Sequence, residues 1–186
     1  QYTKEMLTEK LHEALSPAYH LDKRAISFAW DAAISEQHAY EERLVEIGAE
    51  HLAKMERSGG RGVVILGRPY NTADMGANLN LPQKIADLGL TAFPVVMLPL
   101  SDIRVDKRFH NMYWKLGRTI LQASTLVASH KNLNAVFMTN FGCGPDSFIQ
   151  TYVERIMKGK PMLMLELDEH SADAGYITRL EAFRDV

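Results

Sequence analysis

The first third of the chain shows a helical pattern of apolar positions. Across residues 22–57, large or apolar residues recur at spacings close to three and four, which predicts one long amphipathic helix. Asp22 suits the start of this helix, and Gly59 and Gly60 suit its end. A shorter helix is expected over residues 4–15, ending before Ser16 and Pro17. We therefore expect a helical N-terminal segment over residues 1–60, which packs on the domain that follows or on a neighbour.

From residue 61 onward, short apolar runs alternate with helical patterns. Runs that are apolar on both faces are typical of parallel strands covered by helices on both sides. Crossover connections between such strands are right-handed almost without exception. Residues 61–186 are therefore expected to form one compact α/β unit with a doubly wound, flavodoxin-like or Rossmann-like, mostly parallel sheet of four or more strands. The expected strands are 63–66, 92–98, 135–138 and 162–165, and the expected helices between them are 80–88, 111–129 and 146–158.

Composition narrows the function classes. The 186 residues suit a single domain, and a formal net charge of -2 provides no broad basic field for nucleic acid or an anionic membrane. The longest apolar stretch is too short to span a bilayer. The single cysteine excludes an internal disulfide and any metal cluster held by this chain's thiolates alone, which fits a reducing cytoplasm. Because the chain opens with Gln1 and shows no leader, we expect a fragment of a larger protein.

Polar residues gather where the expected strands end. Ligands of open parallel sheets bind beyond the carboxyl ends of the strands, so these positions are candidates for a site. Arg68 suits an anion or a structural ion pair, and residues 168–173 suit metal ligands, an acid/base pair or a polar network that fixes the loop. No glycine-rich nucleotide fingerprint accompanies them. The candidates that line this edge are Arg68, Asn71, Asn140, Asp168, Glu169 and His170.

The loop after the third strand carries the sharpest chemical signal. Gly142 and Gly144 flank Cys143 and allow a tight turn with close backbone approach to a ligand, and Pro145 suits the first turn of a helix. The positive end of that helix favours a thiolate, which is a nucleophile or a metal ligand. The alternative is a small cysteine buried in a tight turn.

Three separated strings resemble a known family. Residues 67–71, 140–148 and 168–183 are similar, in order and spacing, to the uncharacterised domain DUF2229 of large CoA-substrate enzyme activase proteins. That domain is itself similar to component D of 2-hydroxyacyl-CoA dehydratases and to double-cubane cluster proteins. The resemblance runs from about residue 22 to the C-terminus.

This resemblance implies an oxygen-sensitive iron-sulfur protein of anaerobes. In the related enzymes, an ATP-hydrolysing activator passes a low-potential electron to a cluster held by cysteines, and that electron drives acyl-CoA chemistry. Cys143 matches a cluster-ligating position, so the resemblance implies a [4Fe-4S]-type cluster whose other ligands lie outside this chain. The implied partners are the activator ATPase module, the remaining domains of the parent protein and acyl-CoA. The isolated fragment is expected to be inactive.

Two other functions fit the same sequence. The long helix over residues 22–57, with its one-sided apolar stripe, would suit a non-catalytic docking domain for an activator ATPase. A flavodoxin-like sheet could instead bind a flavin phosphate without any metal.

Overall fold

The protein is described by a computed structural model that covers residues 2–140, 142–168 and 173–186. The chain divides into two compact units, Gln1–Leu44 and Val45–Val186. The long helix α2, Lys23–Arg57, contributes its first part to one unit and its last part to the other. No described helix is long and apolar enough to cross a membrane.

The first unit is a pair of helices. Helix α1, Lys4–Tyr19, begins at Thr3, whose hydroxyl accepts a hydrogen bond from the Met6 amide. The predicted end before Ser16 was wrong, because the helix continues through Pro17 to a left-handed residue, His20. The amide of His20 donates to the Ser16 carbonyl and the Ser16 hydroxyl donates to the Leu21 carbonyl, so local hydrogen bonds close the last turn despite the proline.

The predicted long helix is confirmed. A carboxylate oxygen of Asp22 accepts a hydrogen bond from the Ala25 amide at 2.7 Å, as an N-terminal cap does, and Gly59 adopts a positive φ of 66° after the helix ends. Ion pairs from Lys4 to Asp31 and from Lys23 to Glu9 join α1 to the first part of α2. Because these side chains are largely exposed, each pair stabilises the unit only weakly.

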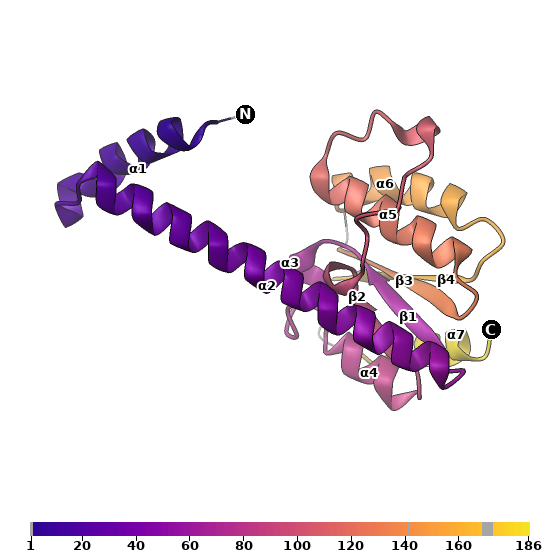
Figure 1. The fold of residues 1–186 in the computed structure, drawn as a ribbon. Helices are drawn as coiled ribbons and strands as arrows, with labels where there is room; N and C mark the ends of the chain where they lie inside the picture. The colour runs from indigo at the N-terminus through magenta and orange to yellow at the C-terminus, as the bar shows by residue number, and fades with distance from the viewer. Residues whose placement is uncertain (1, 141, 169–172) are drawn as a thin grey trace. The chain divides into compact units, whose positions relative to one another are not determined.

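The second unit contains an all-parallel sheet of four strands. The strands are β1 (Gly62–Leu66), β2 (Thr91–Pro94), β3 (Leu133–Asn140) and β4 (Met162–Leu167), in the order β2-β1-β3-β4. Strand β1 is buried along its whole length between two parallel neighbours. The expected doubly wound α/β fold is therefore confirmed (Figure 1).

The second strand is shorter than its apolar run predicts. Residues 92–98 were expected to be extended, but β2 stops at Pro94 and a 3-10 turn, η1 (Val95–Met97), follows. Proline has no amide hydrogen to donate to the sheet, so the ladder ends where it stands. Apolar composition alone could not distinguish the strand from the buried turn after it, in which Val95 is also buried.

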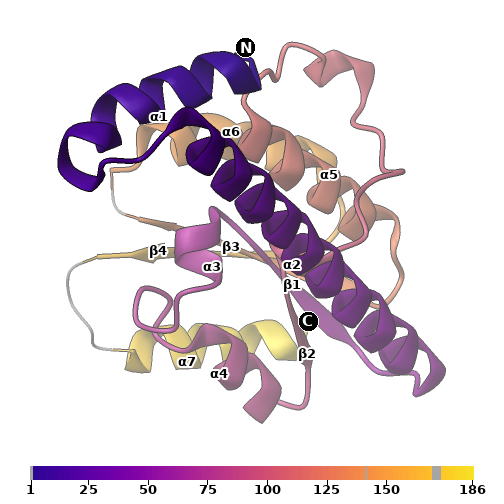
Figure 2. The ribbon, with the colours of Figure 1, turned by 60° about the vertical axis from the view of Figure 1, so that its left-hand side comes forward.

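Helices cover both faces of the sheet, as Figure 2 shows. The alternating side chains of β1 divide the interior into two cores: Val64 and Leu66 pack with α5 and α6, whereas Val63 and Ile65 pack with α4 and α7. The helices and the short turn of this unit are α3 (Pro69–Thr72), α4 (Leu81–Asp87), η2 (Lys107–Phe109), α5 (Lys115–Ser129), α6 (Gly144–Ile156) and α7 (Ala174–Arg184). Helix α5 begins four residues later than predicted, because residues 111–114 belong to an irregular connection.

The last turns of α2 also contribute to the core of the second unit. Met55 is buried at 3% exposure in the core formed with α5 and α6. At Gly48, a Cβ atom would lie 1.7 Å from the carbonyl oxygen of Met97. Only glycine permits so close an approach of this helix to the turn after β2.

Candidate functional site

The candidate site lies where β1 and β3 end, at the carboxyl edge of the sheet. A Cβ on Gly67 would lie 2.8 Å from the carbonyl oxygen of Met138, so a glycine is needed where the chain leaves β1 beside β3. Pro69 then starts α3 directly after Arg68. This sharp turn holds Arg68 next to the loop that follows β3.

Arg68 connects three other side chains at this edge. Its Nη2 lies 2.7 Å from the Sγ atom of Cys143 and 3.1 Å from Oδ2 of Asp146. Its guanidinium carbon lies 4.7 Å from the centre of the Tyr70 ring, which is a favourable cation–π position. We call Arg68, Tyr70, Thr139, Cys143 and Asp146 the Arg68–Cys143 cluster.

Asp146 is the buried member of this cluster. Its side chain is 1% exposed, and the same Oδ2 atom that meets Arg68 also accepts a hydrogen bond from the Thr139 hydroxyl at 2.8 Å. The residue lies in the first turn of α6, where the positive end of the helix favours a carboxylate. The sequence suggested no more than a helix-cap role for it. An acidic residue in the first turn after a strand, facing an arginine after a neighbouring strand, was the signal that could have revealed it.

The ion pair leaves polar atoms unused. Nε of Arg68 and Oδ1 of Asp146 are buried without a hydrogen-bond partner among the described residues. Of the two roles left open for Arg68, the structure shows the ion pair. Partial desolvation raises the pKa of Tyr70 above its usual value; the Arg68 cation opposes this, while Asp146 and Cys143 add to it.

Two predicted asparagines meet beside the cluster. The Nδ2 amide of Asn71 donates to Oδ1 of Asn140 at 2.6 Å, and Asn71 is 1% exposed. This bond ties α3 to the end of β3. The structure therefore brings together Arg68, Asn71, Asn140 and Cys143 from different segments of the sequence.

The remaining predicted residues lie around this centre or outside the described part. Gly142 has a positive φ of 70°, and neither it nor Gly144 would place a Cβ within 4 Å of another group, so the backbone on both sides of Cys143 is open. Asp168 follows β4 and is exposed. Glu169 and His170 lie outside the described residues.

An aromatic hollow of about 420 Å³ lies beside the start of α6. The ring of Tyr152 meets those of Phe109 and Phe148 edge to face, each at a centroid distance of 5.2 Å. The start of α6, immediately after Cys143, therefore borders an apolar surface. The residues that line the hollow are Arg108, Phe109, Asn111, Met112, Tyr113, Trp114, Gly144, Pro145, Phe148 and Tyr152.

The chemistry of the cluster centres on the sulfur of Cys143. The residue is partly exposed and follows a turn in which Gly142 gives access to it. A thiolate in this position would face the Arg68 cation and could act as a nucleophile or as a metal ligand. Within the described residues, no group of three or more His, Cys, Asp or Glu side chains could hold a metal ion. Any metal at this edge would therefore need donors from elsewhere.

The fold and the cluster define a parallel α/β domain with a cysteine at the carboxyl edge of its sheet. The sequence model of the family described as CoA enzyme activase uncharacterised domain, DUF2229, matches residues 1–98. The match covers more than half of the chain, which therefore belongs to this family. Comparison with curated proteins and with solved structures found no match.

The family match refines the resemblance seen in the sequence. It includes the N-terminal helices before residue 22, from which the resemblance was expected to begin. Of the three strings, residues 67–71 lie inside the matched range, whereas 140–148 and 168–183 lie beyond it. Family membership suggests an activase-related role. The link to 2-hydroxyacyl-CoA dehydratases stays a prediction.

Proposed function

We propose that the chain is a domain of an iron-sulfur protein that takes part in ATP-driven, low-potential electron transfer to acyl-CoA chemistry. In this proposal, Cys143 supplies one thiolate to a [4Fe-4S]-type cluster. The observation that supports it is the position of the sulfur: partly exposed, at the carboxyl edge of the sheet, and 2.7 Å from the Arg68 guanidinium. The family's description as a CoA enzyme activase domain supports the same class of chemistry.

The donor set fits one corner of such a cluster. Iron-sulfur clusters are held by three or four thiolates, and this chain has one cysteine. The remaining ligands would come from other domains of the parent protein, together with the activator ATPase. When bound, the cluster would supply one-electron chemistry at low potential.

The chain's own residues would orient the sulfur and adjust its charge. Arg68 donates toward Sγ and would stabilise negative charge on sulfur, while Asp146 holds the guanidinium in place. The Asn71–Asn140 bond fixes the strand end from which the cysteine loop starts. Acyl-CoA and the ATPase module are the proposed partners, in the reducing cytoplasm of an anaerobe.

The proposal is tested on the full-length parent protein. Anaerobic reconstitution with iron and sulfide should give less iron per chain, and weaker thiolate-to-iron absorbance, for Cys143→Ala than for the wild type. Met75→Ala is the matched control, because it removes a 65% exposed sulfur that cannot form a thiolate. Iron content and absorbance that are the same in Cys143→Ala and wild type would exclude the thiolate role.

A second candidate function is supported by the first unit. The helices of this unit expose large apolar side chains, including Tyr19 at 68%, Phe28 at 77% and Tyr40 at 58%. Exposed apolar groups of this size mark protein-binding surfaces. The unit could therefore dock the activator ATPase. In a pull-down of that ATPase under anaerobic conditions, Phe28→Ser with Tyr40→Ser should reduce capture, and undiminished capture would rule out this surface.

A further inference from the structure

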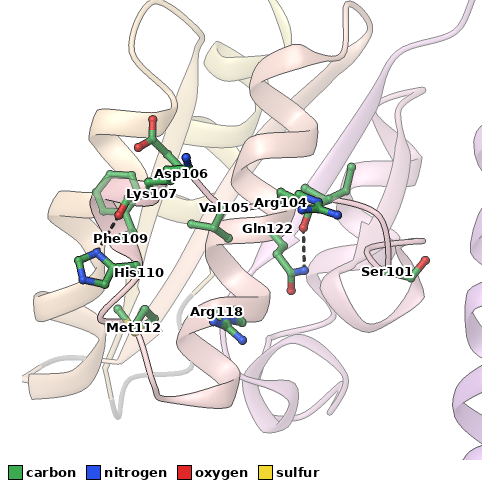
Figure 3. Close-up of a pocket in the computed structure, with 11 residues that line it drawn as sticks. Ser101, Arg104, Val105, Asp106, Lys107, Phe109, His110, Met112, Arg118 and Gln122 are labelled. Atoms are coloured by element: carbon green, nitrogen blue, oxygen red, sulfur yellow. Dashed lines mark hydrogen bonds between the residues drawn. The ribbon is translucent and has the colours of Figure 1, made fainter.

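A second hollow, of about 840 Å³, lies on the connection between β2 and α5 (Figure 3). Its walls come from residues 101–112 of the connection and from Arg118 and Gln122 of α5. Small-molecule sites commonly have volumes of roughly 300–1,000 Å³, so the hollow is large enough for a ligand. It shares no residue with the Arg68–Cys143 cluster, so a site here can be tested independently of the proposed function.

Hydrogen bonds hold the wall of this hollow in place. The side-chain amide of Gln122 donates to the carbonyl oxygens of Leu100 at 3.2 Å and Ile103 at 2.8 Å. Nδ1 of His110 lies 2.8 Å from the carbonyl oxygen of Lys107. Figure 3 shows the Gln122 contact to the connection and the His110 contact within it. The connection is therefore fixed to α5 and shaped before any ligand arrives.

The hollow carries an excess of positive charge. Arg104, Lys107 and Arg118 line it without a carboxylate partner among the described residues. The carboxylate that also lines it, Asp106, is held by Arg108: Oδ2 accepts from the guanidinium at 2.9 Å and Oδ1 accepts from the backbone amide at 2.8 Å. Three cations therefore stand uncompensated around one hollow, on a chain whose net charge is -2.

Apolar side chains line the same hollow between the cations. Val105, Phe109 and Met112 contribute to the lining, and Figure 3 shows Val105 between the labelled cationic residues. Phe109 is 7% exposed and also belongs to the core, which keeps this wall rigid. A ligand that matches the hollow therefore combines several negative charges with an apolar part.

We propose that this hollow binds a small organic anion that carries at least two phosphate groups. Guanidinium groups match the geometry of phosphate oxygens with paired N–H donors. Two arginines and a lysine around one space need more than one negative charge to balance them. The apolar lining adds contact area for the organic part, which inorganic polyphosphate lacks.

Calorimetric titration of the full chain at low salt tests the proposal with ADP, inorganic pyrophosphate and adenosine as probes. ADP should bind with a dissociation constant below about 1 mM, and pyrophosphate should bind more weakly than ADP, because it lacks the organic part. Adenosine should not bind measurably. Replacing Arg104 and Arg118 by Gln should weaken ADP binding by about tenfold or more, since charged hydrogen bonds are lost. The matched control Lys131→Gln removes an exposed cation away from the hollow and should change affinity by less than about twofold.

Two results would overturn the proposal. One is the absence of binding of both ADP and pyrophosphate at millimolar concentration. The other is an equal loss of affinity in Lys131→Gln and in the Arg104 and Arg118 variant, which would indicate charge attraction without a site. NMR of the labelled chain gives an independent measurement if the double variant unfolds: shifts on ADP addition should fall within residues 101–122, and shifts confined to other residues would contradict the assignment.

Discussion

The ion pair between Arg68 and Asp146 gives the sharpest prediction of stability. The side chains are 16% and 1% exposed, so both charges are largely removed from water. Breaking a buried pair by removing one partner typically costs about 3–5 kcal/mol, because the other charge stays buried without compensation. We expect Arg68→Met to fall in this range, since it leaves the Asp146 carboxylate with the Thr139 hydroxyl as its described hydrogen-bond partner.

The double variant should recover much of this loss. Arg68→Met combined with Asp146→Leu replaces the pair by apolar groups of similar volume, which is often close to neutral. The expected coupling free energy between the two positions is therefore of the order of 1–3 kcal/mol. Urea unfolding of all four proteins measures it, with an unchanged slope in denaturant as the sign that the two-state comparison is valid.

An exposed pair of the same residue types is the control for this cycle. Arg108 and Asp106 lie 2.9 Å apart with side chains that are 72% and 44% exposed. Arg108→Met and Asp106→Leu should each change the free energy of unfolding by less than about 1 kcal/mol. Single variants at Arg68 and Asp146 that cost no more than this control, or costs that simply add in the double variant, would refute the assignment of a buried, coupled pair.

Two further predictions concern other elements of the second unit. Gly48→Ala should destabilise the protein by about 1–3 kcal/mol in urea unfolding, because its Cβ would lie 1.7 Å from the Met97 carbonyl oxygen, whereas Gly175→Ala in the open start of α7 should be neutral or stabilising; equal effects would contradict this close approach. A hydrogen bond and ion pair from Lys84 lower the pKa of Asp173, so the stability that this pair contributes is present above the carboxyl's unfolded pKa of about 3.9 and is lost as pH falls through the lower folded value. Asp173→Asn should therefore lower Tm at pH 7 and have no effect in strong acid, and a difference in Tm that persists at every pH would contradict the linkage.

The sequence predicted the sheet because parallel strands covered on both faces leave short apolar runs. It failed where one signal served two structures: Pro94 ends a strand inside an apolar run, and Pro17 lies within the last turn of a helix that closes through His20. Both outcomes depend on hydrogen bonds that the residue pattern does not contain.

The candidate site was predictable for a topological reason, and its gaps have one as well. Arg68 and Asn140 each follow a parallel strand, so their approach follows from the order of the strands in the sheet. The role of Asp146 was hidden because a carboxylate in the first turn of a helix already has a local explanation. The hollow between β2 and α5 was missed because the connection has no periodicity, and its arginine, lysine and histidine side chains converge through the folding of an irregular segment.

The geometry gives one cation two partners. The same Nη2 atom of Arg68 lies within 2.7 Å of the Cys143 sulfur and 3.1 Å of the Asp146 carboxylate. If the sulfur carries negative charge, it competes with the carboxylate for that donor, while Nε of Arg68 remains without a described partner. Any change in the charge of the sulfur therefore alters how strongly the guanidinium holds Asp146, and through Asp146 and Thr139 it reaches the first turn of α6 and the end of β3. The chemistry of the exposed edge and the stability of the buried pair are for this reason expected to be coupled.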